Sequence, residues 1–280
     1  MTTLIIGGSG NVGLPLLRAL AGRAGVTALV RTDEDAASAR ELDIAPVRGD
    51  LAEPASLSTA FKGVDRLFLL TPFVENQEDL ENNALDAAEK AGVDHVVKLA
   101  YAGIDWPIDI TQAHRTIQAR LLDAPYVSTL LLAEVFATNV LGQTDLLRQG
   151  QFVLPGATAR IGYVDPADVG QVAAALLAAA APPVGRIVVT GPDQLTNDQV
   201  AAVAGRTLTG APARYVTVEA EPFIGSLTAA GWPPFTARAV AEMHLTIAAR
   251  GPIPTSDATQ TWVGRPATPL ADFLARVASS

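Results

Sequence analysis

The sequence predicts an α/β fold in which a doubly wound parallel sheet is followed by a smaller C-terminal lobe. Short β-like runs alternate with helical stretches through the first half of the chain, as in parallel sheets covered by helices. A glycine-rich turn joins the first such run to the first helical stretch. After about residue 140 the alternation loosens, and Pro and Gly become frequent over residues 210–234. We therefore expect a core over residues 1–140, with residues 141–280 adding the last sheet strands and a small α/β covering lobe to one integrated domain.

Each element of this fold has its own signal. Runs of apolar and β-branched residues predict strands at residues 3–6, 26–30, 45–48, 66–70, 95–99 and 127–132. Helical length and apolar spacing occur between them, at residues 12–21, 78–91 and 110–122. In the second half, residues 165–168 begin an Ala-rich helix and a strand covers residues 186–189. Thr196-Asn197-Asp198-Gln199 is a helix-start signal before residues 200–208, and a further helix covers residues 237–249.

Composition excludes several classes of protein. The net charge of −9 argues against a nucleic-acid partner, because such binding depends on Lys and Arg that neutralise phosphates. The absence of cysteine excludes disulfides and thiolate ligands, and the three histidines lack ligand spacing, so no metal is expected. The long apolar stretches at residues 128–137 and 172–181 are too short to span a bilayer, and the first residues have no secretory features. We therefore expect a cytoplasmic protein with no membrane partner.

The glycine-rich turn at residues 7–13 has the spacing of a dinucleotide-binding loop. Its three spaced glycines follow the first predicted strand and precede the first predicted helix. Glycines allow a tight turn and the close approach of a pyrophosphate, whose charge is attracted by the N–H groups and the dipole of the helix start. This strand–loop–helix context makes the motif specific. The expected cofactor contacts in the loop are Gly7, Ser9, Gly10, Asn11, Val12 and Gly13.

The ends of the next two predicted strands bear on the choice of cofactor. Arg31 follows the second strand, where an acid would bind the ribose 2′-hydroxyl of NAD and a cation suits the 2′-phosphate of NADP. NADP(H) is therefore favoured over NAD(H), although three following acids compete for Arg31, which could instead be a solvated surface charge. Asp50 and Leu51 follow the third strand, where the carboxylate could accept a hydrogen bond from the adenine amino group or cap a turn.

Several short motifs then occur in a specific order. They include Ala-Leu-Val-Arg at residues 28–31, Gly-Asp-Leu at 49–51, Val-Val-Lys-Leu at 96–99 and Thr-Gly-Pro at 190–192, with further matches at 7–13, 63–70, 114–117, 136–139 and 163–169. In this order they resemble the NmrA-like branch of the atypical short-chain dehydrogenases over nearly the whole chain. The resemblance implies a Rossmann-like, NADP(H)-binding fold with Gly7, Gly10, Gly13, Arg31, Asp50 and the loop Thr71-Pro72-Phe73 around the cofactor. It implies no single activity, because the family includes quinone reductases, other small-molecule reductases and redox-sensing regulators.

The catalytic signature of standard short-chain dehydrogenases is absent. Those enzymes place a Ser near the end of the fifth strand and Tyr-x-x-x-Lys on the next helix; here the strand ends at Tyr101 and the helix carries His114 and Gln118. Ordinary alcohol–ketone interconversion is therefore disfavoured, because an isolated alkoxide needs a strong proton donor. His114, with an ordinary pKa of about 6.5, could replace that donor or be a half-buried helix residue. Gln118 could orient substrate or ribose, and Tyr101 could bind a carbonyl oxygen or form an aromatic wall.

The expected substrate pocket is mainly aromatic, which suits a flat, weakly polar molecule. Its candidate lining residues, besides those at the cofactor, are Trp106, Gln118, Phe136 and Trp232. Trp232 precedes two prolines and could be part of a lid or of the core.

Three further acidic residues are candidates for a role in the pocket or for helix capping. Glu134 follows a Leu-Ala pair at the place where the family usually has Arg-Pro. It either points into the pocket, where it would disfavour anions, or lies on the surface. Asp165 and Asp168 precede a helix, so capping explains them better than a catalytic pair of carboxylates.

Two functions remain open. The favoured one is an NADPH-dependent reductase of a small conjugated carbonyl or quinone-like substrate, because a delocalised product anion lowers the demand for a proton donor. The alternative is a non-catalytic NADP(H)-binding redox sensor that acts through a protein partner, since the acidic composition disfavours DNA. A homodimer is compatible with either function.

Overall fold

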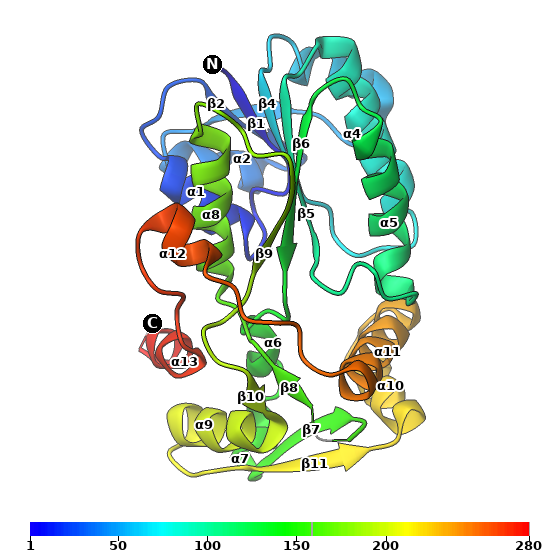
Figure 1. The fold of residues 1–280 in the computed structure, drawn as a ribbon, viewed down its shortest axis with the longest axis vertical. Helices are drawn as coiled ribbons and strands as arrows, with labels where there is room; N and C mark the ends of the chain where they lie inside the picture. The colour runs from blue at the N-terminus through cyan, green and yellow to red at the C-terminus, as the bar shows by residue number, and fades with distance from the viewer. Residues whose placement is uncertain (158, 280) are drawn as a thin grey trace.

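A parallel sheet forms the centre of the molecule (Figure 1). The structure is a computed structural model and describes residues 1–157 and 159–279. The sheet strands are β1 (Thr3–Ile5), β2 (Val26–Val30), β3 (Ala45–Arg48), β4 (Arg66–Leu69), β5 (His95–Tyr101), β6 (Val127–Ala133) and β9 (Gly185–Val189). They lie in the order β3-β2-β1-β4-β5-β6-β9, and each neighbouring pair is parallel. The predicted α/β class and doubly wound sheet are confirmed.

The strand order places a ligand site at one edge of this sheet. β1 lies between β2 and β4, so the chain winds toward one side from β1 and toward the other side from β4. The carboxyl ends of β1 and β4 therefore flank the point where the winding reverses. In open α/β sheets, ligands bind at that point.

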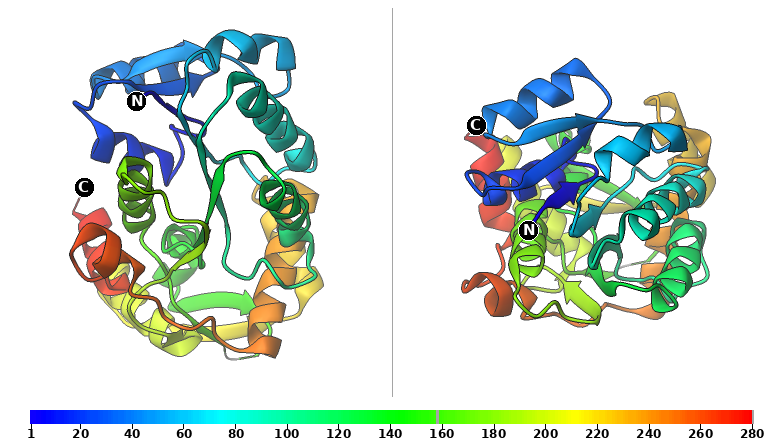
Figure 2. Two further views of the ribbon diagram at one scale, coloured as in Figure 1. Left: turned by 45° about the horizontal axis from the view of Figure 1, so that its top comes forward. Right: turned by 90° about the horizontal axis from the view of Figure 1, so that it is seen from above.

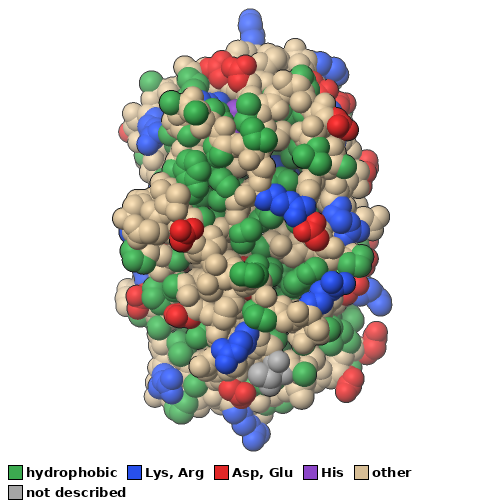
Figure 3. All heavy atoms as spheres, viewed as in Figure 1, with side chains coloured by type: hydrophobic (Ala, Val, Ile, Leu, Met, Phe, Trp, Pro, Cys, Tyr) green, Lys and Arg blue, Asp and Glu red, His purple; other side chains and the backbone are tan. Residues whose placement is uncertain are grey.

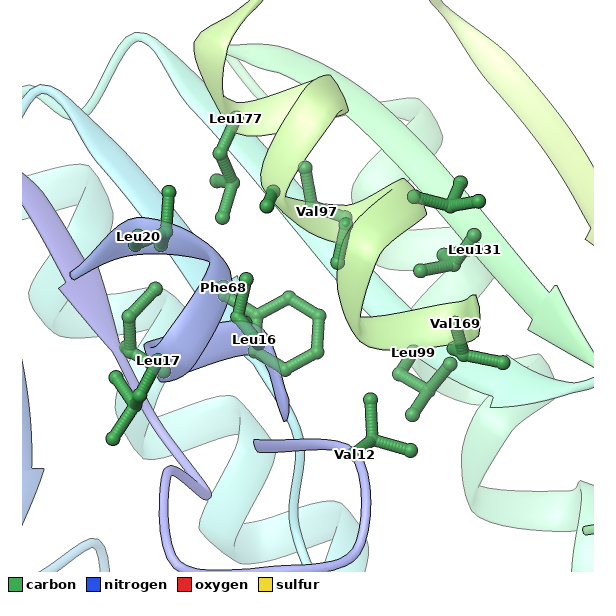
Figure 4. Packing of buried hydrophobic residues seen from close by; sticks show 14 of the residues in the cluster. Val12, Leu16, Leu17, Leu20, Phe68, Val97, Leu99, Leu131, Val169 and Leu177 are labelled. Carbon is green, nitrogen blue, oxygen red and sulfur yellow. The ribbon is translucent and has the colours of Figure 1, made fainter. Parts of the chain in front are cut away.

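Helices cover both faces of the sheet. One face carries α1 (Gly13–Leu20), α2 (Asp33–Glu41), α8 (Pro166–Ala178) and α12 (Ala258–Val263). The other carries η1 (Pro54–Ser56), α3 (Leu57–Ala60), α4 (Gln77–Ala91) and α5 (Asp109–Leu122). Figure 4 shows how Leu16 of α1 and Val169 of α8 meet strand side chains such as Phe68 and Val97, all of which are buried. Packing of α1 against α8 thus supports the glycine loop, which lies directly before α1.

The predicted elements of the first half occur close to their expected bounds. β2 and β3 have the expected bounds, while β5 extends to Tyr101 and β6 to Ala133. Helix α2 was not predicted, because its sequence is polar and only Ala36 and Ala39 are buried. It starts where the Thr32 hydroxyl accepts a hydrogen bond from the Asp35 amide at 3.1 Å.

The remaining elements form a lobe beyond the carboxyl edge of the sheet. Its strands are β7 (Gln151–Pro155), parallel to β11 (Arg214–Val218), and β8 (Arg160–Ile161), antiparallel to β10 (Leu195–Thr196). Its helices are α6 (Thr138–Leu141), α7 (Thr144–Arg148), α9 (Asn197–Thr209), α10 (Ala220–Ala229), α11 (Pro234–Arg250) and α13 (Leu270–Ala278). These four short strands were not predicted, because each pairs with a segment distant in sequence. The predicted helix start at Thr196 is confirmed by a complete capping box with Gln199.

The C-terminal segment connects the lobe to the sheet layers. After α11, residues 251–257 cross the molecule to α12, which packs on α8 (Figures 1 and 2). Asp168 is completely buried and accepts hydrogen bonds from Arg265 at 2.6 Å and from the Thr268 amide at 2.6 Å. Asp165 accepts one from the Ala167 amide at 2.9 Å, which caps α8, and also pairs with Arg276 at 2.5 Å. Capping of α8 by Asp165 is confirmed, and both carboxylates also hold the C-terminal segment.

The surface is mixed in charge. On the face shown in Figure 3, positive and negative side chains are interspersed among apolar ones.

Among the described residues, we find no helix that combines the length and apolar character needed to cross a membrane.

Candidate functional site

The glycine loop closes tightly on the start of α1. Gly7 has a φ of +82°, and a Cβ added to it would lie 2.5 Å from the Leu70 carbonyl oxygen. A Cβ on Gly13 would lie 1.9 Å from the Gly7 carbonyl oxygen, whereas one on Gly10 would meet only that oxygen, at 3.6 Å. Gly7 and Gly13 are therefore required by the close approach of the backbone, while Gly10 faces open space.

Unpaired donors face outward from this loop. Ser9 and Asn11 are exposed, whereas Val12 is buried against the core. Within the described chain, the amides of Asn11, Val12 and Gly13 donate no hydrogen bond. Free amides at a helix start, together with the helix dipole, make a binding site for an anion.

Two arginines lie together beside the loop, at the ends of β2 and β3. Arg31 is exposed, and its guanidinium makes no hydrogen bond or ion pair with the described residues. Arg48 Nη1 donates to the Arg31 carbonyl oxygen at 2.7 Å, and its Nη2 pairs with Asp33. Asp33 therefore binds Arg48 rather than competing for Arg31. Sequence reasoning missed Arg48, although its place at the end of a strand next to β2 was a usable signal.

Asp50 forms a turn, as one of its two predicted roles required. Its Oδ1 accepts a hydrogen bond from the Ala52 amide at 2.9 Å, and its own amide donates to Ser56 Oγ at 2.9 Å. Oδ2 has no partner among the described residues. Leu51 is buried, and its carbonyl accepts from Asn83 at 2.8 Å. This loop is thus rigid, with one carboxylate oxygen still free to accept.

The loop after β4 contacts the lobe through an aromatic pair. Pro72 is exposed, and the Phe73 ring stacks on Phe235 of α11, with centroids 4.9 Å apart and planes inclined by 22°. A cavity of about 180 Å³ lies beside this pair. Its lining includes Phe73, Phe235, Gln77, Asp109, Gln112 and Ala113, from α4, α5 and α11. Phe235 was not a candidate, since nothing in the sequence indicates which residue of α11 reaches this loop.

Two further cavities lie apart from the loop after β4. One of about 440 Å³ opens between α3 and α4, where Gly63 and Ala91 precede strands at the amino edge of the sheet. Another of about 460 Å³ is lined by Pro192 and Ser256 beside α12. Neither contains the predicted catalytic residues.

Thr71 and His114 meet in one buried polar network. Thr71 Oγ1 donates to Glu81 Oε1 at 2.5 Å, and Lys98 Nζ lies 2.9 Å from the same oxygen. Lys98 Nζ also lies 3.3 Å from His114 Nδ1. Burial, together with the charge of Lys98, lowers the pKa of His114 well below 6.5. The expectation that His114 titrates near neutral pH is therefore wrong, because its ring is neutral there.

Gln118 is hydrogen-bonded to an arginine of β9. Its Oε1 accepts a hydrogen bond from Arg186 Nη2 at 3.0 Å, and Arg186 also forms a bidentate pair with Asp105. Gln118 was expected to orient substrate or ribose, but Arg186 holds its amide at the edge of the sheet. The spacing of one helical turn from His114 was insufficient because it did not reveal this partner on β9.

Tyr101 is buried beneath the lobe. Its ring packs edge-on against Trp106, with centroids 5.9 Å apart, and its hydroxyl has no hydrogen-bond partner among the described residues. Burial and the nearby carboxylate of Glu134 raise its pKa above the ordinary value of 10. The hydroxyl therefore keeps its proton and can serve as a hydrogen-bond donor. Trp106 thus packs against Tyr101, and its place in the substrate pocket stays a prediction.

Glu134 is buried and does not lie on the surface. It is 2% exposed, and its Oε1 accepts a hydrogen bond from the Gly162 amide at 3.0 Å. Burial raises its pKa to about 7, against the opposing effects of Gly162 and of Gln194 at 3.5 Å from Oε2. The expected surface position of this residue is thus wrong, whereas its place in the pocket stays a prediction. It joins the end of β6 to the loop after β8.

The other two predicted lining residues occupy different places. Phe136 is half-buried and packs on the cluster that contains Val12, on the glycine-loop side of the sheet. Trp232 is 41% exposed and has no ring contact within the described chain. It precedes α11, which carries Phe235, so Phe235 rather than Trp232 contacts the loop after β4.

Comparisons with known proteins agree with this geometry. The family model described as the NmrA-like family matches residues 1–244. An NAD(P)H azoreductase from Xenophilus azovorans is 31% identical over 277 residues, which cover 96% of each protein. A (4-alkanoyl-5-oxo-2,5-dihydrofuran-3-yl)methyl phosphate reductase from Streptomyces griseus is 30% identical over 285 residues, covering 99% of this chain and 98% of the relative.

Solved structures show the same fold. An NADPH-dependent quinone oxidoreductase from Escherichia coli, complexed with NADPH, superposes with a TM-score of 0.90 at 23% identity over 99% of both chains. Triphenylmethane reductase from Citrobacter sp., complexed with NADP(H), has a TM-score of 0.88 at 22% identity, covering 99% of this chain and all of the other. These likenesses show a Rossmann-like fold over nearly the whole chain. Together with the family match and the relatives above, they show that the chain belongs to the NmrA-like family.

Proposed function

We propose that the protein is an NADPH-dependent reductase of a small conjugated acceptor such as a quinone. The glycine loop fits the pyrophosphate of a dinucleotide. Gly7 and Gly13 leave no room for a Cβ, and the amides of Asn11 and Val12 are free to donate. When bound, the nicotinamide supplies the hydride.

The two arginines favour NADPH over NADH. Arg31 follows β2, where an acid would be needed to bind the 2′-hydroxyl of NAD, and its guanidinium is free of internal partners among the described residues. Arg48, anchored on the Arg31 carbonyl and on Asp33, adds a second positive charge beside it. A guanidinium binds phosphate oxygens through charge-assisted, bidentate hydrogen bonds.

One observation carries the choice of acceptor: the candidate proton donors of the site are both weak acids. His114 is neutral because its pKa is well below 6.5, and the pKa of Tyr101 is raised above 10. Each group can donate a hydrogen bond, but neither is a strong proton source at neutral pH. An acceptor that spreads the incoming charge over a conjugated system needs only such a hydrogen bond. An isolated ketone would need a stronger proton donor, because the negative charge would stay on its oxygen.

The activities of the relatives support this choice. The two relatives above are an azoreductase and a (4-alkanoyl-5-oxo-2,5-dihydrofuran-3-yl)methyl phosphate reductase, and one structural neighbour is a quinone oxidoreductase. The aromatic surfaces of Phe73 and Phe235 suit a flat acceptor.

NADPH oxidation with conjugated and unconjugated acceptors tests the proposal. We expect oxidation with a benzoquinone, an azo dye and cyclohexenone. We expect none with cyclohexanone, which matches cyclohexenone but lacks conjugation. A Gly13→Ala variant is the matched protein control, because the added Cβ would collide with the Gly7 carbonyl. Tight NADPH binding without turnover on any conjugated acceptor would contradict the proposal. It would leave the redox sensor, whose partner must then distinguish NADP⁺ from NADPH.

A further inference from the structure

A buried ion pair lies directly beneath the candidate site. Lys98 on β5 is 1% exposed, Glu81 on α4 is completely buried, and Nζ lies 2.9 Å from Oε1. Such pairs contribute little net stability, because their attraction only offsets the cost of removing both charges from water. Apolar residues such as Ala84 and Ala100, fully or almost fully buried, form the core on the same side of the sheet. An apolar pair of similar volume would stabilise the fold equally well.

The pair connects the cofactor side of the site to His114. Glu81 Oε1 also accepts a hydrogen bond from Thr71, in the loop after β4, and one from Gln77 at 3.2 Å. Lys98 Nζ donates to the Leu99 carbonyl oxygen and lies 3.3 Å from His114 Nδ1. One carboxylate and one ammonium therefore join that loop to the imidazole.

The chemistry of the ammonium determines where the imidazole carries its proton. An ammonium can only donate, so His114 Nδ1 must accept and the ring proton must lie on Nε2. His114 is half-buried, and its Nε2 has no hydrogen-bond partner among the described residues. Unlike the enclosed His95 Nδ1, this Nε2 is not fully shut off from solvent. Ala113, which precedes it, lines the cavity beside Phe73.

We propose that Lys98 and Glu81 are positioning residues that keep the proton of His114 on Nε2 and so present an N–H donor to the reducible group of the substrate. This inference rests on the proposed reductase function. The donor stabilises the negative charge that develops on the acceptor oxygen or nitrogen as it is reduced. Because the partner of Nδ1 is internal and fixed, the donor is oriented before substrate binds. Lys98 thus acts through His114 and not on the substrate.

Nitrogen NMR of the imidazole tests the tautomer without any turnover. In protein labelled with ¹⁵N-histidine, we expect one histidine with a protonated Nε2 and an accepting Nδ1, unchanged between pH 6 and pH 8. The signal is assigned by its loss in a His114→Asn variant. A protonated Nδ1, or an imidazolium that titrates in this range, would overturn the inference.

A double variant tests the role of the pair. Lys98→Met with Glu81→Leu removes both buried charges together, so that neither is left unpaired, and is expected to fold. We expect mixed His114 tautomers and a kcat lower by about tenfold or more, with the Kd of NADPH changed by less than about twofold. Lys90→Met, at an exposed lysine near the end of α4, is the matched control and should change neither.

The two readouts separate this inference from the proposed function. An unchanged NMR spectrum and unchanged kcat in the folded double variant would overturn the positioning role, even if the wild-type enzyme reduces quinones. The wild type could instead show the expected tautomer, and lose it in the double variant, but have no turnover. That result would overturn the reductase proposal but support the structural part of the inference.

Discussion

Arg31 is the residue on which we propose that the choice between the two dinucleotides depends. It follows β2, where a cation suits the 2′-phosphate of NADPH, and NADH lacks that group. We expect Arg31→Ala to weaken NADPH binding by about 10- to 100-fold, because a charge-assisted hydrogen bond is lost. NADH binding should change by less than about twofold. Titration of cofactor fluorescence measures both constants. Arg40→Ala, an exposed arginine in the last turn of α2, is the control, and an equal loss for both cofactors would contradict the assignment.

Glu134 makes the stability of the protein depend on pH. Its pKa is raised from 4.5 to about 7 in the folded state, so the folded protein holds a proton that the unfolded chain releases. The contribution is fully present below pH 4.5 and is lost as the pH rises to about 7. We expect the unfolding free energy of the wild type to fall relative to that of Glu134→Gln by about 2–3 kcal/mol between pH 5 and pH 8.

Urea unfolding of both proteins at several pH values measures this difference. Gln at position 134 still accepts the hydrogen bond from Gly162, so the fold is retained. His95 and His244, whose pKa values burial lowers to about 4, change stability in the opposite direction as the pH falls, but they are common to both proteins and cancel. Exposed Glu53→Gln is the control. Parallel pH profiles for wild type and Glu134→Gln would contradict the assignment.

At this scale, sequence reasoning found residues that act through the backbone and missed those that act through buried partners. Gly7 and Gly13 were identifiable because their spacing encodes a local turn. Lys98 and Glu81 lie far apart in the chain and meet only when α4 packs on β5. His114 was found by its position on a helix, but its protonation depends on that partner. A pKa cannot be read from a local pattern, because burial and neighbouring charges determine it.

The glycine loop and α1 act as one element. A Cβ on Gly13 would lie 1.9 Å from the Gly7 carbonyl, so Gly13→Ala must move the helix start away from the loop. We expect it to weaken NADPH binding by about tenfold or more, because amide positions that differ by about 1 Å no longer converge on a phosphate. Calorimetric titration measures the affinity. Gly142→Ala is the control, since its φ is −62° and its Cβ would have an ordinary contact at 3.5 Å; equal affinities would contradict the role of Gly13.

Helix α11 meets the loop after β4 through a single aromatic contact. Removal of the Phe235 ring should weaken the binding of an aromatic acceptor by the free energy of one stacked aromatic pair. We therefore expect Phe235→Ala to raise the KM of that acceptor about 2- to 10-fold. The Kd of NADPH should not change, since α11 lies outside the sheet layers. Steady-state kinetics with a quinone separate the two constants. Trp232→Ala, three residues earlier and 41% exposed, should have little effect; a larger effect there than at Phe235 would reverse the assignment.

Elements of the sheet core were predictable, whereas those of the lobe were only partly so. The buried parallel strands form mainly apolar runs, as in β5, where every residue from His95 to Tyr101 is buried. The two-residue strands β8 and β10 carry no periodicity, and β7 pairs with β11 only after a long excursion of the chain. Polar α2 is held by its Thr32 cap and two buried alanines. Short or polar elements depend on tertiary contacts that a local pattern does not contain.

The path of the chain ties the lobe and the sheet into one structure. The helices α6 and α7 and the strands β7 and β8 lie in the lobe, α8 and β9 return to the sheet layers, and the chain enters the lobe again before α12 packs on α8 (Figure 1). Buried Asp168 then holds Arg265 and Thr268 on the way to α13, which packs on α9. Neither part can unfold without releasing contacts of the other. We therefore propose that the change of pattern expected near residue 140 lies within one integrated domain.

We expect this connectivity to produce a single cooperative unfolding transition. The three tryptophans report on different regions: Trp106 packs on Tyr101 beneath the lobe, Trp232 precedes α11, and Trp262 of α12 packs on the core of the sheet. Proteins that retain one tryptophan each, with phenylalanine at the other two positions, should show the same urea midpoint by fluorescence and by far-ultraviolet circular dichroism. Different urea midpoints for Trp262 and Trp106 would mean that the lobe and the sheet unfold independently. Residues 251–257 and the hydrogen bonds of Asp168 would then not couple the two parts.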